Sequence, residues 1–262
     1  MSGPSMVYLM YHEIELPGRA MCQDEPGYQR YVVRNADFEA QMRWLKSEGW
    51  RGLPVSEGLA SARLPGVVIT FDDGCETDLL TAAPLLRELG FGATFYITVG
   101  FLGRPGFLTR AQLRELAELG CEIGSHSMTH AYLSDLAPQQ LVREISDSRT
   151  ELAQITGQSI DHFSCPGGRW NSQVIAAARQ AGYRSVASSQ AIANPTSPFE
   201  PFPLGRLAVM RETPLEEFRR LARGHGLWRI RFADSARSAL KRALGNSAYD
   251  RLRGRLLDRG AR

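Results

Sequence analysis

The chain has 262 residues, of which 43% are hydrophobic and 23% charged, and its formal net charge is +3. These values are ordinary for a soluble globular protein and exclude a disordered or fibrous one. The length allows one sizeable core, so we expect one main domain. Residues 1–10 contain no basic segment and no long apolar segment, and no other stretch is long and apolar enough for a membrane span. We therefore expect a cytoplasmic protein without a signal peptide.

Short apolar runs alternate with amphipathic segments along the chain, as strands and helices do when they follow each other. The predicted strands cover residues 6–10, 66–73, 93–98, 121–125, 162–165, 183–187 and 207–210. The first predicted helix begins at a cap, Asn35 or Asp37, and ends near Gly49. Further helices are predicted over residues 78–89, 110–119, 138–157 and 171–181, and a last one begins at residues 213–216. Capping boxes open the helix over 110–119, at Thr109 and Gln112, and the last helix, and Pro138 stands near the first turn of its helix. The alternation predicts a parallel sheet rolled into a barrel, with loops from the carboxyl strand ends lining one mouth.

The stretch over residues 66–74, Gly-Val-Val-Ile-Thr-Phe-Asp-Asp-Gly, is the most informative one. Buried parallel strands are continuous apolar runs, and an Asp-Gly pair marks a turn. Asp72 and Asp73 are therefore expected at the carboxyl end of a buried strand, where α/β folds carry their chemistry. Since side chains alternate along a strand, one carboxylate can hold a cation while the other moves protons. A turn or helix-capping role is the alternative.

His126 and His130 are four residues apart and follow another short predicted strand. On one helical turn this spacing aims both imidazoles at one point. Two histidines and one carboxylate make the three-ligand set of a catalytic zinc site, which leaves a position open for water. A pair of histidines that only caps the start of a helix is the alternative.

The four cysteines, Cys22, Cys75, Cys121 and Cys165, form no CxxC pair, and a chain of this length does not need disulfides. We expect four free thiols that pack as small apolar groups. Cys75 stands two residues after Asp73 and is the cysteine for which we expect a minor role.

Residues 70–74 (Thr-Phe-Asp-Asp-Gly) and 126–130 (His-Ser-Met-Thr-His) strongly resemble the first two motifs of the polysaccharide deacetylase family, the NodB-homology amide hydrolases of carbohydrate esterase family 4. Their order and separation match as well. Residues 11–13 and 38–42 are similar to the branch with an N-terminal Met-Tyr-His strand, so the resemblance covers residues 6–221. It implies a distorted (β/α)7 barrel and a divalent-metal hydrolase that removes N-acetyl groups from amino sugars.

Carried over residue by residue, the resemblance implies that Asp73, His126 and His130 are metal ligands and that Asp72 is the catalytic base. Zn²⁺ is the expected metal, with Co²⁺, Ni²⁺ or Mn²⁺ as alternatives. Such a cation lowers the pKa of a bound water, and the unligated carboxylate takes the water's proton. The candidate oxyanion and substrate contacts, which include a possible sugar-stacking tryptophan, are Pro166, Gly167, Gly168, Arg169 and Trp170.

Three family features are missing from this sequence. Many members carry a base-orienting arginine around residues 163–168, where Ser164 or Cys165 stands here, although Arg169 follows. The fourth motif, with Asp and Trp, is absent between residues 183 and 201, and so is the Leu-x-His motif that supplies a general acid. Because an amide needs its leaving amine protonated, we hypothesise that His12, at the end of the first strand, is the acid.

Residues 229–262 differ from the rest, with ten Lys or Arg against three Asp and with helical apolar spacing. We therefore divide the chain into a barrel over residues 1–222 and a basic amphipathic helical extension over 223–262. The extension either packs on the barrel or contacts an anionic membrane surface, which would place the protein at the cytoplasmic membrane face. Nucleic acid is not expected as a partner, because aromatic residues are sparse in this segment.

Three functions remain open from the sequence alone. The first is a metal-dependent deacetylase acting on N-acetylated sugars of an exopolysaccharide, a surface glycan or a lipid-linked precursor. The second is a related hydrolase of a small non-glycan amide, although the complete Asp-His-His set argues against the metal-free members of that group. The third is a catalytically silent carbohydrate-binding barrel in an assembly system, against which the retention of both Asp72 and Asp73 argues.

Overall fold

The computed structural model describes residues 5–60, 65–196 and 199–232. Its strands are β1 Ser5–Tyr11, β2 Ile14–Glu15, β3 Val33–Arg34, β4 Arg51–Leu53, β5 Gly66–Asp73, β6 Thr94–Ile97, β7 Glu122–Ser125, β8 His162–Ser164, β9 Ser185–Ala187, β10 Asn194–Pro195 and β11 Leu207–Ala208. Its α-helices are α1 Pro26–Gln29, α2 Asn35–Ser47, α3 Val55–Ala60, α4 Ala83–Leu89, α5 Arg110–Glu118, α6 Pro138–Thr156, α7 Ser172–Gln180 and α8 Leu215–Ala222. Shorter helical turns are η1 Asp78–Ala82, η2 Val99–Phe101, η3 Leu133–Asp135 and η4 Pro166–Gly168.

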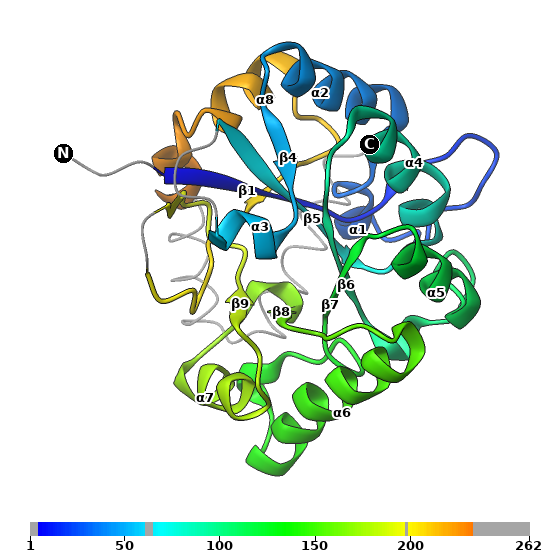
Figure 1. Ribbon diagram of the computed structural model, residues 1–262, viewed down its shortest axis with the longest axis vertical. Helices are drawn as coiled ribbons and strands as arrows, with labels where there is room; N and C mark the ends of the chain where they lie inside the picture. The colour runs from blue at the N-terminus through cyan, green and yellow to red at the C-terminus, as the bar shows by residue number, and fades with distance from the viewer. Residues whose placement is uncertain (1–4, 61–64, 197–198, 233–262) are drawn as a thin grey trace.

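One curled sheet organises the chain, with the strand order β10-β1-β5-β6-β7-β8-β9, and β4 and β11 pair with β5 and β1. Within this sheet every pair is parallel except β1 with β10. Helices α2, α4, α5, α6 and α7 lie around its outside (Figure 1). The predicted distorted barrel is confirmed, because the crossover helices cover the outer face of a parallel sheet.

The segment over residues 204–208 connects the two edges of the curled sheet. Leu204 forms a parallel bridge with Ala187 at the end of β9, and β11 pairs with β1. Two hydrogen bonds hold this bridge to β9. The Leu204 amide donates to the Val186 carbonyl at 2.7 Å, and the Ser188 amide donates to the Leu204 carbonyl at 2.8 Å. Between these two pairings stands Arg206, whose exposed fraction is only 1%. The closing segment therefore delivers a buried charge to the interior.

Aromatic rings fix the central strands against one another. The ring of Phe71 in β5 stacks on Phe95 of β6, with centroids 4.8 Å apart, and on Tyr11 of β1 at 5.4 Å. All three side chains are fully buried. Offset-stacked pairs contribute about 0.5–1.5 kcal/mol each beyond their buried area. This packing sets the relative positions of the residues at the carboxyl ends of β1, β5 and β6.

Several local predictions are corrected by the structure. Neither Asn35 nor Asp37 caps α2, because the helix begins at Asn35 and Arg34 precedes it. The helix expected from residue 78 begins with the π-helical turn η1 and becomes α-helical only at α4. No side chain caps α8, since the Thr213 hydroxyl accepts a hydrogen bond from the Met210 amide instead. The Thr109–Gln112 capping box of α5 is confirmed.

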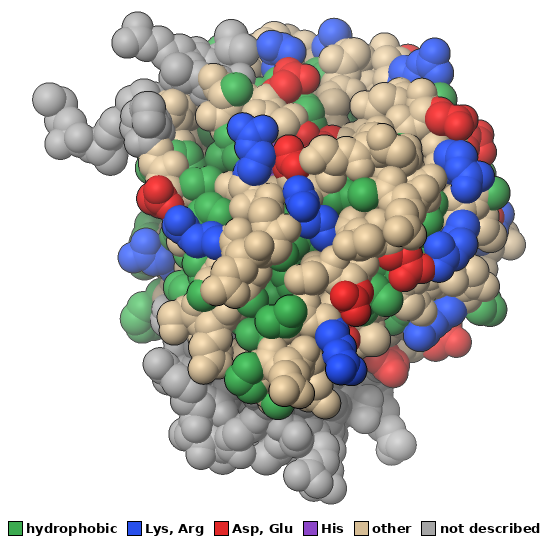
Figure 2. Space-filling model, turned by 60° about the horizontal axis from the view of Figure 1, so that its bottom comes forward, with side chains coloured by type: hydrophobic (Ala, Val, Ile, Leu, Met, Phe, Trp, Pro, Cys, Tyr) green, Lys and Arg blue, Asp and Glu red, His purple; other side chains and the backbone are tan. Residues whose placement is uncertain are grey.

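The predicted basic extension over residues 223–262 lies mostly outside the described residues. Residues 227–232 are helical, with Leu227 buried and Trp228 and Phe232 exposed. Acidic and basic side chains are interspersed over the described surface that Figure 2 shows. Within the described ranges, no helix is long and apolar enough to cross a membrane. The division into barrel and extension stays a prediction.

Candidate active site

Three side chains from the carboxyl ends of β5 and β7, the strands on either side of β6, converge on one point. Asp73 ends β5, and His126 and His130 follow β7. The Nε2 atoms of His126 and His130 lie 3.5 Å and 3.4 Å from Oδ1 of Asp73, and the three ligand atoms lie within 4.8 Å of one another. Oδ1 of Asp73 is buried and has no hydrogen-bond partner among the described residues. One carboxylate and two imidazoles arranged in this way fit a divalent metal ion.

The backbone around this site is strained. Asp73, Ser127 and His130 have φ values of 80°, 69° and 64°, in the left-handed region that non-glycine residues avoid. Each such residue costs on the order of 1–3 kcal/mol, and such residues cluster at functional sites. The expected helical turn at the histidines is wrong, because residues 126–132 form no helix. Instead the Ser127 hydroxyl accepts the His130 amide at 3.0 Å, and this turn brings the two rings to 5.0 Å.

The surroundings of the histidines favour the form that binds a metal. Nδ1 of His126 donates to the Ser164 carbonyl oxygen at 2.9 Å, so its Nε2 lone pair is available on the Asp73 side. Burial lowers the pKa of His126 to about 3 and also lowers the pKa of His130. Both imidazoles are therefore neutral near pH 7, as metal ligation requires.

Asp72, the neighbouring carboxylate, is held by a buried arginine. Nη1 and Nη2 of Arg206 donate to Oδ1 and Oδ2 of Asp72, both at 2.7 Å. Arg206 also donates to the Ser164 hydroxyl at 2.8 Å and to the Ser188 carbonyl at 2.9 Å. This bidentate geometry fixes the plane of the carboxylate, which the single ammonium group of a lysine could not do.

The two carboxylates differ in their electrostatics. Burial alone would raise the pKa of Asp72, but the positive charge of Arg206 and the hydrogen bonds that it donates hold this pKa well below the usual range. Burial raises the pKa of Asp73 to about 6, opposed by the charge of His12 and supported by the charge of Asp72. Oδ2 of Asp72 lies 3.9 Å from Nε2 of His126. An ionised carboxylate thus stands beside the candidate ligand set.

No pattern in the sequence pointed to Arg206 as a partner of Asp72. Asp72 and Arg206 are 134 positions apart, and no motif links them. Arg169, the arginine considered from the sequence, lies with its Cζ 3.5 Å from the ring centroid of Tyr132. The available signal was a lone arginine directly before the apolar residues of the last predicted strand, a position from which a side chain can enter a barrel.

His12 directly follows β1, and Tyr11 of β1 pairs with Phe71 of β5, so His12 stands beside the strand end that carries Asp72 and Asp73. Its ring packs on Tyr31 with centroids 4.7 Å apart, and its Nδ1 is buried with no hydrogen-bond partner among the described residues. The structure therefore brings His12 to the mouth at which Asp72 and Asp73 stand.

The turn over residues 166–170 is built on two glycines with positive φ, 61° at Gly167 and 66° at Gly168. A Cβ at Gly168 would lie 1.9 Å from the Ser189 hydroxyl, so only glycine fits there. The Gly168 amide donates to the Cys165 carbonyl at 2.8 Å and the Arg169 amide to the Pro166 carbonyl at 3.3 Å. These two N–H groups are thus engaged within the turn, and an oxyanion role for the segment stays a prediction.

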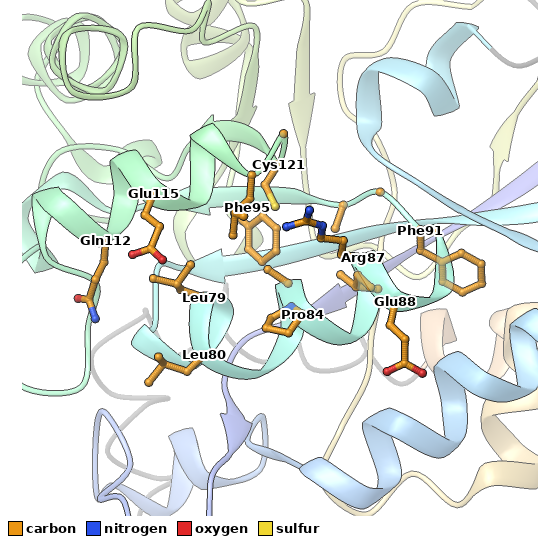
Figure 3. Close-up of a pocket in the computed structure, with 17 residues that line it drawn as sticks. Leu79, Leu80, Pro84, Arg87, Glu88, Phe91, Phe95, Gln112, Glu115 and Cys121 are labelled. Atoms are coloured by element: carbon orange, nitrogen blue, oxygen red, sulfur yellow. The ribbon is translucent and has the colours of Figure 1, made fainter.

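A separate hollow of about 940 Å³ lies between α4 and α5, away from these residues (Figure 3). Leu79, Leu80 and Glu115 line it, and it includes none of the candidate catalytic side chains. The candidate metal ligands therefore lie at the strand ends and not in this hollow.

Comparisons with known proteins agree with the geometry. Residues 61–186 match the family model for polysaccharide deacetylase. The chain is 34% identical over 182 residues to "Putative polysaccharide deacetylase YxkH" of Bacillus subtilis (strain 168), covering 67% of this chain and 61% of that protein. It is 34% identical over 122 residues to a peptidoglycan-N-acetylglucosamine deacetylase of Bacillus cereus, covering 46% of this chain and 54% of the relative. The chain thus spans less than two thirds of the length of either relative.

Solved structures show the same fold. The Streptococcus pyogenes deacetylase PplD, solved in complex with acetate, aligns with a TM-score of 0.73 at 23% identity, covering 84% of this chain and 99% of that chain. At this identity the likeness concerns the fold alone. The family-model match and the relative of 34% identity show that this chain belongs to the polysaccharide deacetylase family.

Proposed function

We propose that this chain is a metal-dependent hydrolase that removes N-acetyl groups from amino sugars of a polysaccharide, an oligosaccharide or a lipid-linked glycan precursor. The observation that carries the proposal is the Asp73-His126-His130 set beside an ionised Asp72 that Arg206 holds in place. The names of two relatives, a peptidoglycan-N-acetylglucosamine deacetylase and a chitooligosaccharide deacetylase, support the substrate class.

Asp73, His126 and His130 would hold the cation, for which we propose Zn²⁺, with Co²⁺, Ni²⁺ or Mn²⁺ as alternatives. When bound, a divalent cation lowers the pKa of water and polarises the amide carbonyl. Asp72 takes a proton from the attacking water, and Arg206 keeps that carboxylate ionised and oriented. Cleavage of the C–N bond releases acetate and an amine, whose nitrogen must receive a proton.

The test is acetate release from N-acetylglucosamine oligomers by metal-stripped protein reloaded with Zn²⁺ or Co²⁺. We expect metal-dependent release that Asp72→Asn abolishes, because the amide cannot take the proton. Asp147→Asn is the matched control, since Asp147 is exposed on α6, and it should retain full release. Protein that binds metal but releases acetate from no acetylated glycan would contradict the proposal.

His12 is our candidate for the acid that protonates the leaving amine. Because a general acid must be protonated, its loss removes the alkaline limb of the pH–rate profile as well as turnover. We expect His12→Gln to show both effects and His225→Gln, at an exposed position, to show neither. Undiminished turnover with an unchanged pH profile in His12→Gln would rule out this role.

The basic residues of 229–262 support a further proposal about location, that the chain works at an anionic membrane surface. Full-length protein should then co-sediment with anionic vesicles and not with neutral ones. Absence of binding to the anionic vesicles would contradict this placement.

A further inference from the structure

A second group of potential metal ligands lies next to the turn that carries Asp73. Glu13 follows β1, Cys22 lies in the loop between β2 and α1, and Cys75 comes directly after the turn that carries Asp73. One carboxylate oxygen and the two sulfur atoms lie within 4.8 Å of one another. Glu13 and Cys75 are buried and Cys22 is partly buried, so this is not an exposed acidic cluster.

Neighbouring groups hold these side chains in position. The Cys22 amide donates to both carboxylate oxygens of Glu13, at 3.0 Å and 3.3 Å. The Tyr28 hydroxyl donates to Glu13 at 2.8 Å and lies 3.4 Å from the sulfur of Cys75. The Cys22 thiol donates to the Gly106 carbonyl at 3.0 Å. Four chain segments thus meet at this cluster.

A buried acid beside the cluster has no partner. Asp78 in η1 is fully buried, and neither of its carboxylate oxygens has a hydrogen-bond partner among the described residues. Its amide donates to the Cys75 carbonyl at 3.0 Å, which places it one turn from that cysteine. A buried carboxyl group without a partner is costly unless a proton or a cation compensates it.

We propose that Glu13, Cys22 and Cys75 form a second cation site, for a thiophilic divalent metal such as Zn²⁺. Thiolates select Zn²⁺ over Mg²⁺ or Ca²⁺, and Zn–S bonds of about 2.3 Å bring two sulfurs within about 4 Å, so a small rotation of the thiols closes the site. Binding releases the two thiol protons to solvent and involves no oxidation.

A metal bound at this site would cross-link the chain next to the turn that carries Asp73. It would join the loop that carries Cys22 to the residue two positions after Asp73, and so hold one wall of the mouth. The inference goes beyond the proposed deacetylase function and does not depend on it.

The test exploits sulfur, which the set of Asp73, His126 and His130 does not contain. Full-length protein, reduced, stripped of metal and kept anaerobic, is titrated with Co²⁺ and followed in the near ultraviolet, where thiolate-to-cobalt charge transfer absorbs. We expect this band in the wild-type protein, with two Co²⁺ bound per chain. His130→Ala should keep the band and lose one Co²⁺.

The cysteine variants locate the band. Cys22→Ser and Cys75→Ser should each abolish it and retain one Co²⁺, whereas Cys121→Ser should keep it, because Cys121 is a free thiol outside the cluster. Cys22 is only partly buried, so its variant is a fair test even if Cys75→Ser fails to fold. The proposal is overturned by a wild-type protein with no charge-transfer band, by a band that survives in Cys22→Ser, or by a mass two hydrogens lower that shows a Cys22–Cys75 disulfide under these conditions.

Discussion

At the scale of single residues, the pair of Asp72 and Arg206 determines whether the carboxylate is ionised and where it points. Arg206→Lys keeps the charge but loses the two-pronged contact and the bonds to Ser164 and Ser188. Charged hydrogen bonds of this kind are worth about 1.5–3 kcal/mol, so we expect kcat/KM for acetate release to fall roughly 10- to 100-fold.

The same variant should shift the pH profile. Arg206 lowers the pKa of Asp72, and a general base works in its ionised form, so weakening the pair raises that pKa. The acid limb of kcat/KM should therefore move to higher pH in Arg206→Lys. Arg169→Lys serves as the control, because Arg169 lies on Tyr132, and its acid limb should stay in place. An acid limb that moves in Arg169→Lys and stays in place in Arg206→Lys would mean that Arg169, and not Arg206, orients the base.

At the scale of elements, the segment that closes the barrel has no room for a side chain before Arg206. A Cβ at Gly205 would lie 2.1 Å from Cγ1 of Ile192 and 2.8 Å from its carbonyl oxygen. Because backbone cannot move aside cheaply, Gly205→Ala should displace the segment and cost about 1–3 kcal/mol, measured by urea unfolding. Gly27→Ala is the control, since nothing lies within 4 Å of its Cβ, and its urea midpoint should not fall. Equal midpoints for the two variants would contradict this account of the closure.

The limits of sequence analysis also appear at this scale. The strand before Asp72 and the capping box at Thr109 were predictable because local patterns specify them. The turn at His126 was not, because its positive φ values follow from tertiary contacts and not from residue spacing. Arg206 enters the site through closure of the barrel, and its place before the last predicted strand did not reveal its partner, Asp72, 134 positions away. Site residues were thus predictable where they belong to one local segment. They were not predictable where the site depends on contacts between distant segments.

At the scale of the whole molecule, metal binding couples the strand ends to the stability of the barrel. Asp73 ends β5 and both histidines follow β7, so a cation at that point cross-links two parts of the sheet that unfolding separates. A metal that binds only the folded state stabilises it by about 2.7 kcal/mol at a free concentration 100 times Kd. For a chain of this size each kcal/mol raises Tm by about 2–4 °C.

We therefore expect Zn²⁺ to raise the Tm of metal-stripped protein by at least about 5 °C, and a chelator to reverse the rise. The two sets of ligands should contribute separately, because they share no residue. His130→Ala should lose the part of the shift that belongs to the Asp-His-His set, and Cys22→Ser the part that belongs to the cysteine cluster. The double variant should then show no shift. A wild-type shift that persists in full in His130→Ala would mean that the Asp-His-His set does not hold the stabilising metal.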